Sequence, residues 1–327
     1  MELRQLRYFV TIAKHGSFSR AAKVIYVAQS ALSYQVAQLE ESLEIKLFHR
    51  LARGVALTEA GSAFLPLAVS ILRQADDARA CLHGTVGNPS GKVTFGLSPS
   101  ICGVLALALM RAVRQKLPGI DLELTEELTG TLARHLQTGE LDLAVLIDDG
   151  SLDPFTCIPL LTERLHLISR PSNAAAPKQR TISFKRTIQL PLLLPTSRQG
   201  VRPLIERCAR TERLSPPNVV AEINSIVILR STLLAGIGNT IQSSMAFKQD
   251  LDSGVLISTP IEKPRLTRTM MLCAPKQIPM TAAVAAVRDT ALEVVNELVG
   301  QGKWSDAMLP VSRNTELDDS GFSRSLP

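Results

Sequence analysis

Residues 17–43, SFSRAAKVIYVAQSALSYQVAQLEESL, contain two short helical patterns with only a few residues between them. In the first, Ser17 or Ser19 can cap a helix, because either hydroxyl can accept a hydrogen bond from a free backbone N–H of the first turn. In the second, apolar residues recur at spacings of four, three and four, at Leu32, Val36, Leu39 and Leu43. This spacing places them on one stripe of an α-helix.

The opposite face of the second helix is polar but almost uncharged. It carries Gln29, Ser30, Ser33, Tyr34 and Gln38. A solvated face usually carries Lys and Glu, whereas these side chains suit the base edges and phosphates of a DNA major groove. We interpret the stretch as a helix-turn-helix whose second helix reads DNA, with Ser17 and Arg20 as further DNA-binding candidates. The alternative from this stretch alone is a small helical bundle with a weakly charged surface.

Residues 45–58, IKLFHRLARGVALT, resemble a wing. They form two short extended runs around residues 52–54, with Arg50 and Arg53 at the turn. Arginines at such a tip would meet phosphates or a minor groove. Tyr8 and Tyr26 of the same domain are expected to be packing residues.

The order and spacing of five motifs resemble the LysR-type transcriptional regulators. The motifs are Phe18-x-x-Ala21-Ala22, Ala28-Gln29-Ser30-Ala31-Leu32-Ser33, Leu39-Glu40, Leu47-Phe48-x-Arg50 and Leu57-Thr58-x-Ala60-Gly61. Residues 222–226 and Gly236-x-Gly238 look like the nitrogen-assimilation-control (Nac) subgroup. Two positions depart from the family pattern: Glu44 stands where glycine usually ends the reading helix, and Tyr34 stands where arginine is frequent.

The composition is that of a folded protein of two or three domains, because 327 residues exceed one usual domain and 45% are hydrophobic. The net charge of +6 is unevenly distributed. Residues 1–57 hold eight Lys and Arg against four Asp and Glu, whereas residues 164–215 hold eleven against two. The most basic segment therefore lies outside the DNA-binding motif, and we interpret it as a solvated surface.

Five scattered cysteines, none in a C-x-x-C pair, argue against a disulfide framework and against zinc, and suit a reducing cytoplasm. The longest apolar run, residues 101–110, is too short to span a bilayer, so we expect no membrane association. The five histidines lack metal-ligand spacing, and no G-x-S-x-G, Walker loop or G-x-G-x-x-G motif occurs. We therefore expect a cytoplasmic protein that is not an enzyme and has no metal or cofactor.

A long helix is expected from Thr58, its cap, to about His83. Spacings of four and three alternate along one side, at Phe64, Ala68, Ile71, Ala75, Ala78 and Leu82. Such a repeat is typical of a coiled-coil seam and predicts a homodimer or homotetramer, as the family resemblance also implies. The alternative is a helix that packs on its own domain. The glycines of residues 84–91 mark the domain boundary that follows.

From Lys92 onward strands alternate with helices, which predicts an α/β fold with a parallel, doubly wound sheet. The expected domains are a winged helix-turn-helix (1–58), a linker helix and hinge (59–90), and a two-lobed effector domain (91–300). Lobe I comprises 91–162 and 267–300, lobe II comprises 163–266, and the chain crosses between them near Leu161 and Leu266. This layout resembles a periplasmic-binding-protein-like domain. Residues 301–327, with the lone Trp304, are expected to form a flexible tail.

Effector-binding candidates lie where strands end, because ligands of doubly wound sheets bind outside the carboxyl ends of the strands. They are Ser98, Ser100, Thr129, Thr196, Ser197, Arg198 and Asn224. Ser98 and Ser100 begin a helix whose free N–H groups favour an anion. Each hydroxyl alone is an ordinary helix cap, and Glu126 and Glu127 nearby would repel an anion.

The sequence thus predicts a LysR-type regulator that binds double-stranded DNA, with RNA polymerase and a small polar or anionic effector as further partners. The Nac likeness implies a role in nitrogen assimilation, and regulators of that kind include some that need no coinducer. The alternative is a solute-binding or enzymatic α/β protein whose N-terminal helices mediate assembly.

Overall fold

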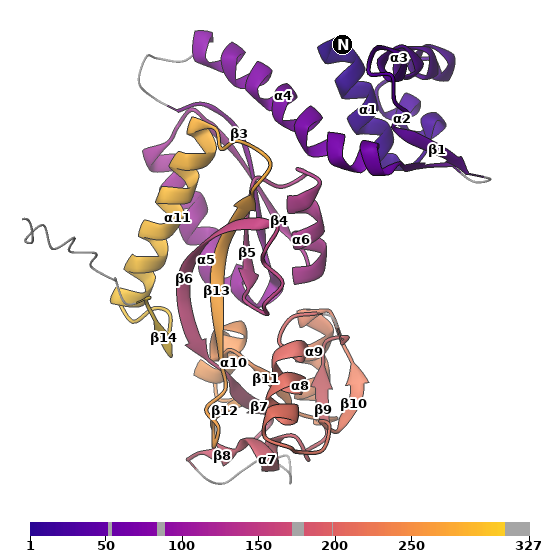
Figure 1. Ribbon diagram of the computed structural model, residues 1–327. Coiled ribbons are helices and arrows are strands. Elements are labelled where there is room, and N and C mark those ends of the chain that lie inside the picture. Colours follow the sequence, from indigo (N-terminus) through magenta and orange to yellow (C-terminus); the bar gives the residue numbers. More distant parts are fainter. Residues whose placement is uncertain (52–53, 84–88, 172–179, 198, 311–327) are drawn as a thin grey trace, which may run out of the picture.

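The computed structural model describes residues 1–51, 54–83, 89–171, 180–197 and 199–310, with the side chains of 77 and 79–83 excepted. Three parts follow one another in space (Figure 1): a small N-terminal domain beside a long helix, a central α/β lobe, and a second α/β lobe at the far end. None of the described helices is both long enough and apolar enough to cross a bilayer.

The N-terminal domain contains three helices and a hairpin: α1 (Leu3–His15), α2 (Phe18–Val24), α3 (Gln29–Ser42), β1 (Phe48–Leu51) and β2 (Gly54–Leu57). Gly16 ends α1 in the left-handed region at φ 60°, and the Ser17 hydroxyl caps α2 by accepting from the Arg20 N–H. Leu32 and Leu39 of the α3 stripe are fully buried against Leu6 and Phe9. The helix-turn-helix and wing are confirmed.

Helix α4 (Glu59–His83) begins at the Thr58 cap, whose Oγ1 accepts from the Gly61 N–H at 2.9 Å. Its first half packs on its own domain: the Phe64 ring lies 5.3 Å from that of Phe9, and Ala68 is 0% exposed. The predicted dimer seam is therefore wrong at Ala68, which has no surface left for a partner. Phe64 likewise serves the domain core.

Lobe I is built on a six-stranded sheet in the order β14-β6-β13-β5-β3-β4. Its elements are β3 (Gly91–Leu97), α5 (Pro99–Lys116), β4 (Ile120–Glu126), α6 (Thr129–Gln137), β5 (Leu143–Ile147), β6 (Phe155–Arg164), β13 (Thr267–Pro275), α11 (Ala282–Gly300) and β14 (Ala307–Met308). Strands β3, β4 and β5 are parallel, as predicted, whereas β13 pairs antiparallel with both β5 and β6. Leu105 of α5 and Val287 of α11 are fully buried in one core with Phe95 of β3.

Lobe II contains a four-stranded sheet, β11-β7-β12-β8, and the parallel pair β10-β9. Its elements are β7 (His166–Ser169), β8 (Ile182–Ser183), α7 (Phe184–Thr187), β9 (Leu192–Leu194), α8 (Arg202–Thr211), β10 (Val219–Glu222), α9 (Ile226–Leu234), β11 (Thr240–Gln242), the 3-10 helix η1 (Ser244–Phe247), α10 (Lys248–Asp252) and β12 (Ile257–Glu262). The helix expected directly after Thr196 begins only at Arg202, so Thr196 and Ser197 lie in a loop. The long strands β6 and β13 lead from one lobe to the other (Figure 1), and the Leu165 N–H donates to the Leu266 carbonyl at the crossing.

The chain does not become a flexible tail at residue 301, and that prediction is wrong for residues 301–310. Strand β14 adds to the lobe I sheet beside β6, and Trp304 is 3% exposed. Its indole Nε1 donates to Glu163 Oε2 at 3.1 Å. Residues 311–327 lie outside the described residues.

Candidate DNA-binding surface and inter-lobe cleft

The polar face of α3 is open to solvent. Gln29, Ser30 and Tyr34 are exposed, whereas Ser33 and Gln38 are half-buried. Ala28 is the N-cap residue of α3, and its side chain makes no capping hydrogen bond. The backbone N–H groups of the first turn therefore receive no side-chain acceptor from the N-cap. Free N–H groups at a helix N-terminus suit DNA phosphates.

Two hydrogen bonds orient this face. Ser19 Oγ of α2 donates to Gln29 Oε1 at 3.0 Å, and Gln38 Nε2 donates to Tyr34 Oη at 2.8 Å. The first bond leaves the Gln29 Nε2 donors and one Oε1 lone pair available for an adenine edge. The arrangement therefore presents a prepositioned amide at the start of α3.

The wing is held from two sides. Gly54 lies so close to the turn after α1 that a Cβ there would lie 2.4 Å from the Gly16 carbonyl oxygen, and the Val55 N–H donates to that oxygen at 3.0 Å. On the other side, Glu40 of α3 accepts from the backbone N–H groups of Leu47 and Phe48. Among the DNA-binding candidates, Arg20 and Arg50 are exposed. Ser17 acts as a cap, and Arg53 lies outside the described residues.

Tyr26 is a surface residue, contrary to the sequence-based expectation. It is 94% exposed in the turn between α2 and α3, at φ 56°, so the prediction that it packs is wrong. Its position beside the reading helix makes it a further candidate for DNA contact. The sequence did hold a signal for this exposure: Tyr26 falls in the short turn between the two helices and belongs to the apolar stripe of neither.

The inter-lobe cleft brings together most of the predicted effector residues. Ser98, Ser100, Thr129 and Asn224 line one cavity. Asn224 Oδ1 accepts from both the backbone N–H and the hydroxyl of Thr196, so Thr196 orients it. Ser197 is exposed and does not line the cavity, and Arg198 lies outside the described residues.

Among the described residues that line the cleft, the charged one is Arg268 on β13, which was not among the predicted residues. Arg268 is 2% exposed, and its Nη1 donates to Ser100 Oγ at 3.1 Å and to Gln242 Oε1 at 3.3 Å. Its Nε donates to the buried Glu163 carboxylate at 2.6 Å. The sequence did hold a signal for this residue, namely an arginine within an apolar strand. Because arginine is almost never fully buried unless it is paired, such a position indicates a buried charged partner.

The cleft is closed. Its cavity measures about 50 Å³, far below the roughly 300–1,000 Å³ of small-molecule sites. The Gly130 N–H of lobe I donates to Gln199 Oε1 of lobe II at 3.0 Å, and Arg207 donates to the Asp149 carbonyl. These two contacts join the lobes.

Two of the scattered cysteines are neighbours in the fold. Cys157 and Cys273 face one another across β6 and β13 with sulfur atoms 2.7 Å apart. Burial raises the pKa of both thiols. The pair is therefore protonated and a poor nucleophile at neutral pH.

Two family models match the chain, and together they cover most of it. Residues 3–62 match the bacterial regulatory helix-turn-helix of the lysR family, and residues 87–296 match the LysR substrate binding domain. The chain belongs to the LysR family of transcriptional regulators. The resemblance carried by the five motifs is confirmed.

Curated LysR relatives extend over nearly the whole chain. The HTH-type transcriptional regulator BbuR of Bordetella bronchiseptica is 30% identical over 91% of this chain and 91% of its own length. The nitrogen assimilation regulatory protein nac of Klebsiella aerogenes is 30% identical over 90% of this chain and 96% of its own length. The helical N-terminal domain is thus a DNA-binding domain of this family, and the alternative of a mere assembly domain is not supported.

Solved LysR structures share the fold. A full-length OxyR variant from Pseudomonas aeruginosa superposes with a TM-score of 0.68 at 23% identity, covering 90% of this chain and 95% of that one. ArgP from Mycobacterium tuberculosis gives 0.68 at 17% identity, covering 89% and 96%. The winged helix-turn-helix followed by a two-lobed α/β domain is therefore the family architecture.

Proposed function

We propose that this LysR regulator reads its operator through α3, with Gln29 as the principal base-reading residue and Ser30, Ser33, Tyr34 and Gln38 around it. The supporting observation is the exposed, uncharged α3 face with a prepositioned Gln29 amide. Ser17, Arg20, Arg50 and Arg53 complete the proposed interface through phosphate contacts, which position the protein without specifying sequence. The protein acts in the cytoplasm as a homodimer or homotetramer and influences RNA polymerase at its promoters. The nac relatives support a role in nitrogen assimilation.

The test compares base reading with phosphate contact. Gln29→Ala should cost roughly 1–3 kcal/mol on the best site and change site preference. Arg50→Ala, the matched control, should weaken specific and random DNA alike and flatten the dependence of affinity on salt. Footprinting on genomic fragments and salt titrations measure both effects. Unchanged discrimination between specific and random DNA in Gln29→Ala would show that another residue reads the site.

A small polar or anionic effector that enters the opened cleft is the second part of the proposal. Ser100, Asn224 and the buried Arg268 converge there, and a guanidinium binds a carboxylate through charge-assisted hydrogen bonds. Metabolites can be screened by thermal shift on the full-length protein. A ligand at 100 times its Kd should add about 2.7 kcal/mol of stability.

Three variants locate the effector. Ser100→Ala and Asn224→Ala should lose most of the gain, whereas Ser197→Ala should keep it because Ser197 lies outside the cavity. Retention of the gain in both cleft variants would place the ligand elsewhere. A screen without any binder would favour regulation that needs no effector.

A further inference from the structure

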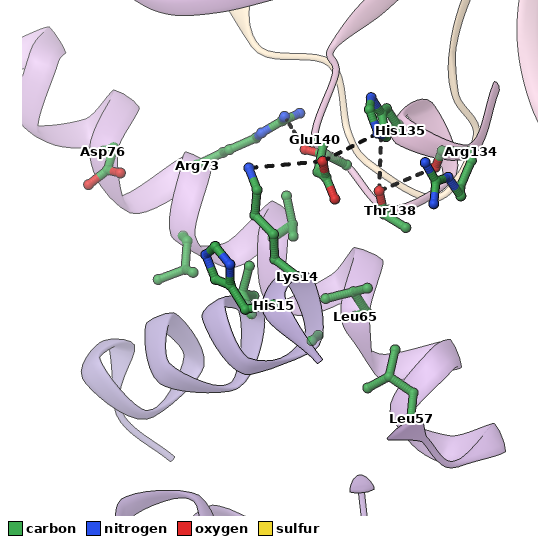
Figure 2. Close-up of a pocket in the computed structure, with 15 residues that line it drawn as sticks. Lys14, His15, Leu57, Leu65, Arg73, Asp76, Arg134, His135, Thr138 and Glu140 are labelled. Atoms are coloured by element: carbon green, nitrogen blue, oxygen red, sulfur yellow. Dashed lines mark hydrogen bonds and ion pairs between the residues drawn. The ribbon is translucent and has the colours of Figure 1, made fainter. Parts of the chain in front are cut away.

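A second cavity, of about 590 Å³, lies between the DNA-binding domain and lobe I. Figure 2 shows it bounded by α1 and α4 on one side and by α6 with its following turn on the other. The volume falls within the roughly 300–1,000 Å³ of small-molecule sites, unlike that of the closed inter-lobe cleft. The two sides of the cavity belong to different functional parts of the same chain.

The floor of the cavity is apolar. Val10 and Ala13 of α1 and Leu65, Val69 and Leu72 of α4 contribute to it. Leu65 and Val69 are each 8% exposed, so only a small part of each side chain contributes to the floor. The floor is thus formed by side chains that are already packed in the domain core. Such a floor accommodates an apolar ligand body, because removing apolar surface from water is favourable.

Among the described residues, the rim of the cavity carries one more cation than its carboxylates neutralise. Arg73 pairs with Asp142, Asp76 with Arg7, and Glu140 lies 3.9 Å from Lys14 and 3.7 Å from His135. Arg134 lines the same rim, and its guanidinium has no ion pair among the described residues. Figure 2 shows Lys14 and Arg73 reaching from the helices toward Glu140 and Arg134 reaching the same space from α6.

Helix α4 and lobe I contact each other directly at residues that line the cavity. Arg73 Nη2 donates to the Gly139 carbonyl at 2.6 Å, and its partner Asp142 also accepts from the Thr94 N–H and hydroxyl. Gly139 packs so tightly that a Cβ would lie 2.7 Å from Val69 Cγ1. Hydrogen bonds and close packing therefore fix the position of α4 relative to lobe I at the cavity.

We propose that this junction cavity binds a small organic anion with an apolar body, whose charge is met by Arg134. Such a ligand contacts the DNA-binding domain and lobe I together. Its affinity is then thermodynamically linked to the orientation of the reading helix, and the linkage is reciprocal. This site is separate from the inter-lobe cleft and does not depend on an effector there.

The test uses 8-anilinonaphthalene-1-sulfonate, which combines an apolar aromatic body with one anionic group. Fluorescence titration of the full-length native protein should show one saturable site. Arg134→Ala should weaken binding by about tenfold, as expected for loss of one charge-assisted contact. Arg134→Lys should retain most of the affinity, and Ala13→Trp should fill the floor and abolish the site.

Lys185→Ala, which removes an exposed cation in lobe II, is the matched control and should leave binding unchanged. Circular dichroism verifies that Ala13→Trp is folded, and Arg134 lies exposed on α6, where alanine is compatible with the helix. Unchanged affinity in Arg134→Ala would overturn the proposal, as would the absence of saturable binding to the wild type. Equal losses in Lys185→Ala and Arg134→Ala would also overturn it, by showing non-specific attraction to positive charge.

Discussion

At the residue scale, Glu44 occupies a backbone conformation that suits glycine. Helix α3 ends at Ser42, and Glu44 then lies at φ 53°, where the Ile45 N–H returns to the Glu40 carbonyl at 3.1 Å. The left-handed conformation costs a residue with a Cβ roughly 1–2 kcal/mol. The departure from the family glycine therefore leaves the helix end in place and adds strain.

Glu44→Gly should stabilise the protein by about 0.5 kcal/mol, because relief of strain exceeds the entropy that glycine adds to the unfolded chain. Glu41→Gly, the same substitution inside the helix, should instead destabilise by about 1 kcal/mol. Urea denaturation of the full-length protein measures both. Equal destabilisation by the two substitutions would show that Glu44 carries no strain.

At the scale of elements, Glu40 joins the reading helix to the wing. Its carboxylate is buried, accepts from the Leu47 and Phe48 N–H groups, and pairs with Lys46 Nζ at 2.8 Å. Burial raises the pKa of Glu40, but the hydrogen bonds from Lys46, Leu47 and Phe48 outweigh it, so the pKa is lowered from 4.5. The carboxylate therefore stabilises the folded domain in its ionised form.

Because the folded pKa of Glu40 is depressed, the unfolded chain takes up the proton at higher pH. Its stabilisation is complete above about pH 4.5 and is lost as the pH falls through the folded pKa. Thermal unfolding between about pH 6 and about pH 3 should show a steeper acid loss in the wild type than in Glu40→Gln. Glu41→Gln, at an exposed neighbour, should follow the wild type. The same acid profile in all three proteins would contradict the assignment.

The predicted dimer seam of α4 is shorter than the spacing of its apolar residues indicates. Phe64 and Ala68 serve their own domain, which leaves Ile71, Ala75 and the exposed Ala78 on that side. The side chain of Leu82 lies outside the described residues. The seam stays a prediction, now centred on Ala75 and Ala78.

Ala75→Asp and Ile71→Asp should abolish dimers in sedimentation velocity, because each buries a charge without a partner in the seam. Ala75→Asp separates this effect from the domain core, in which Ile71 has a partial share. Gln74→Asp, on the exposed side of α4, should remain dimeric. Dimers that persist in both seam variants would show that the subunits associate through another surface.

At the scale of the whole molecule, one buried cluster ties the two lobes to the C-terminal segment. Glu163 of β6 accepts from Arg268 of β13, from the Ser243 hydroxyl of lobe II at 2.7 Å, and from the Trp304 indole. The cluster sits beside the crossing strands, and Arg268 reaches from it into the cleft. The strand crossing between the lobes and the proposed effector cleft therefore share one carboxylate.

Trp304→Ala should destabilise the protein by roughly 3–5 kcal/mol, since it removes a buried indole and a donor to a buried carboxylate. Trp304→Phe should cost less, because it keeps most of the packing and removes only the donor. A chain that ends at Pro310 retains the contacts that the described residues make in this cluster and is the control. One that ends at Gly300 should lose at least as much stability as Trp304→Ala, because it also removes β14 from the lobe I sheet. Denaturant unfolding compares the four proteins. Full stability of the chain ending at Gly300 would show that the cluster does not need the segment.

Much of the fold follows from the pattern of apolar, polar and turn-forming residues over short stretches of sequence. The stripe of α3, the glycine that ends α1, the wing and the alternation of strands and helices follow from periodicity and turn chemistry, which act over a few residues. The family motifs lie in the same local stretches, so the DNA-binding half of the candidate site was accessible from sequence. Ser98, Ser100, Thr129 and Asn224 were found because strand ends of a parallel sheet meet at one edge.

Only the tertiary structure decided which distant groups meet. Arg268 and Glu163 lie 105 residues apart, and Trp304 reaches Glu163 from a segment whose polar composition predicts a tail. Ala68 fits a dimer seam by spacing, yet its surface is taken by the domain beside it. The junction cavity needs α1, α4 and α6 together. The physical reason is that periodicity specifies which face of an element is apolar, whereas the partner that covers that face is set by packing between elements far apart in the chain.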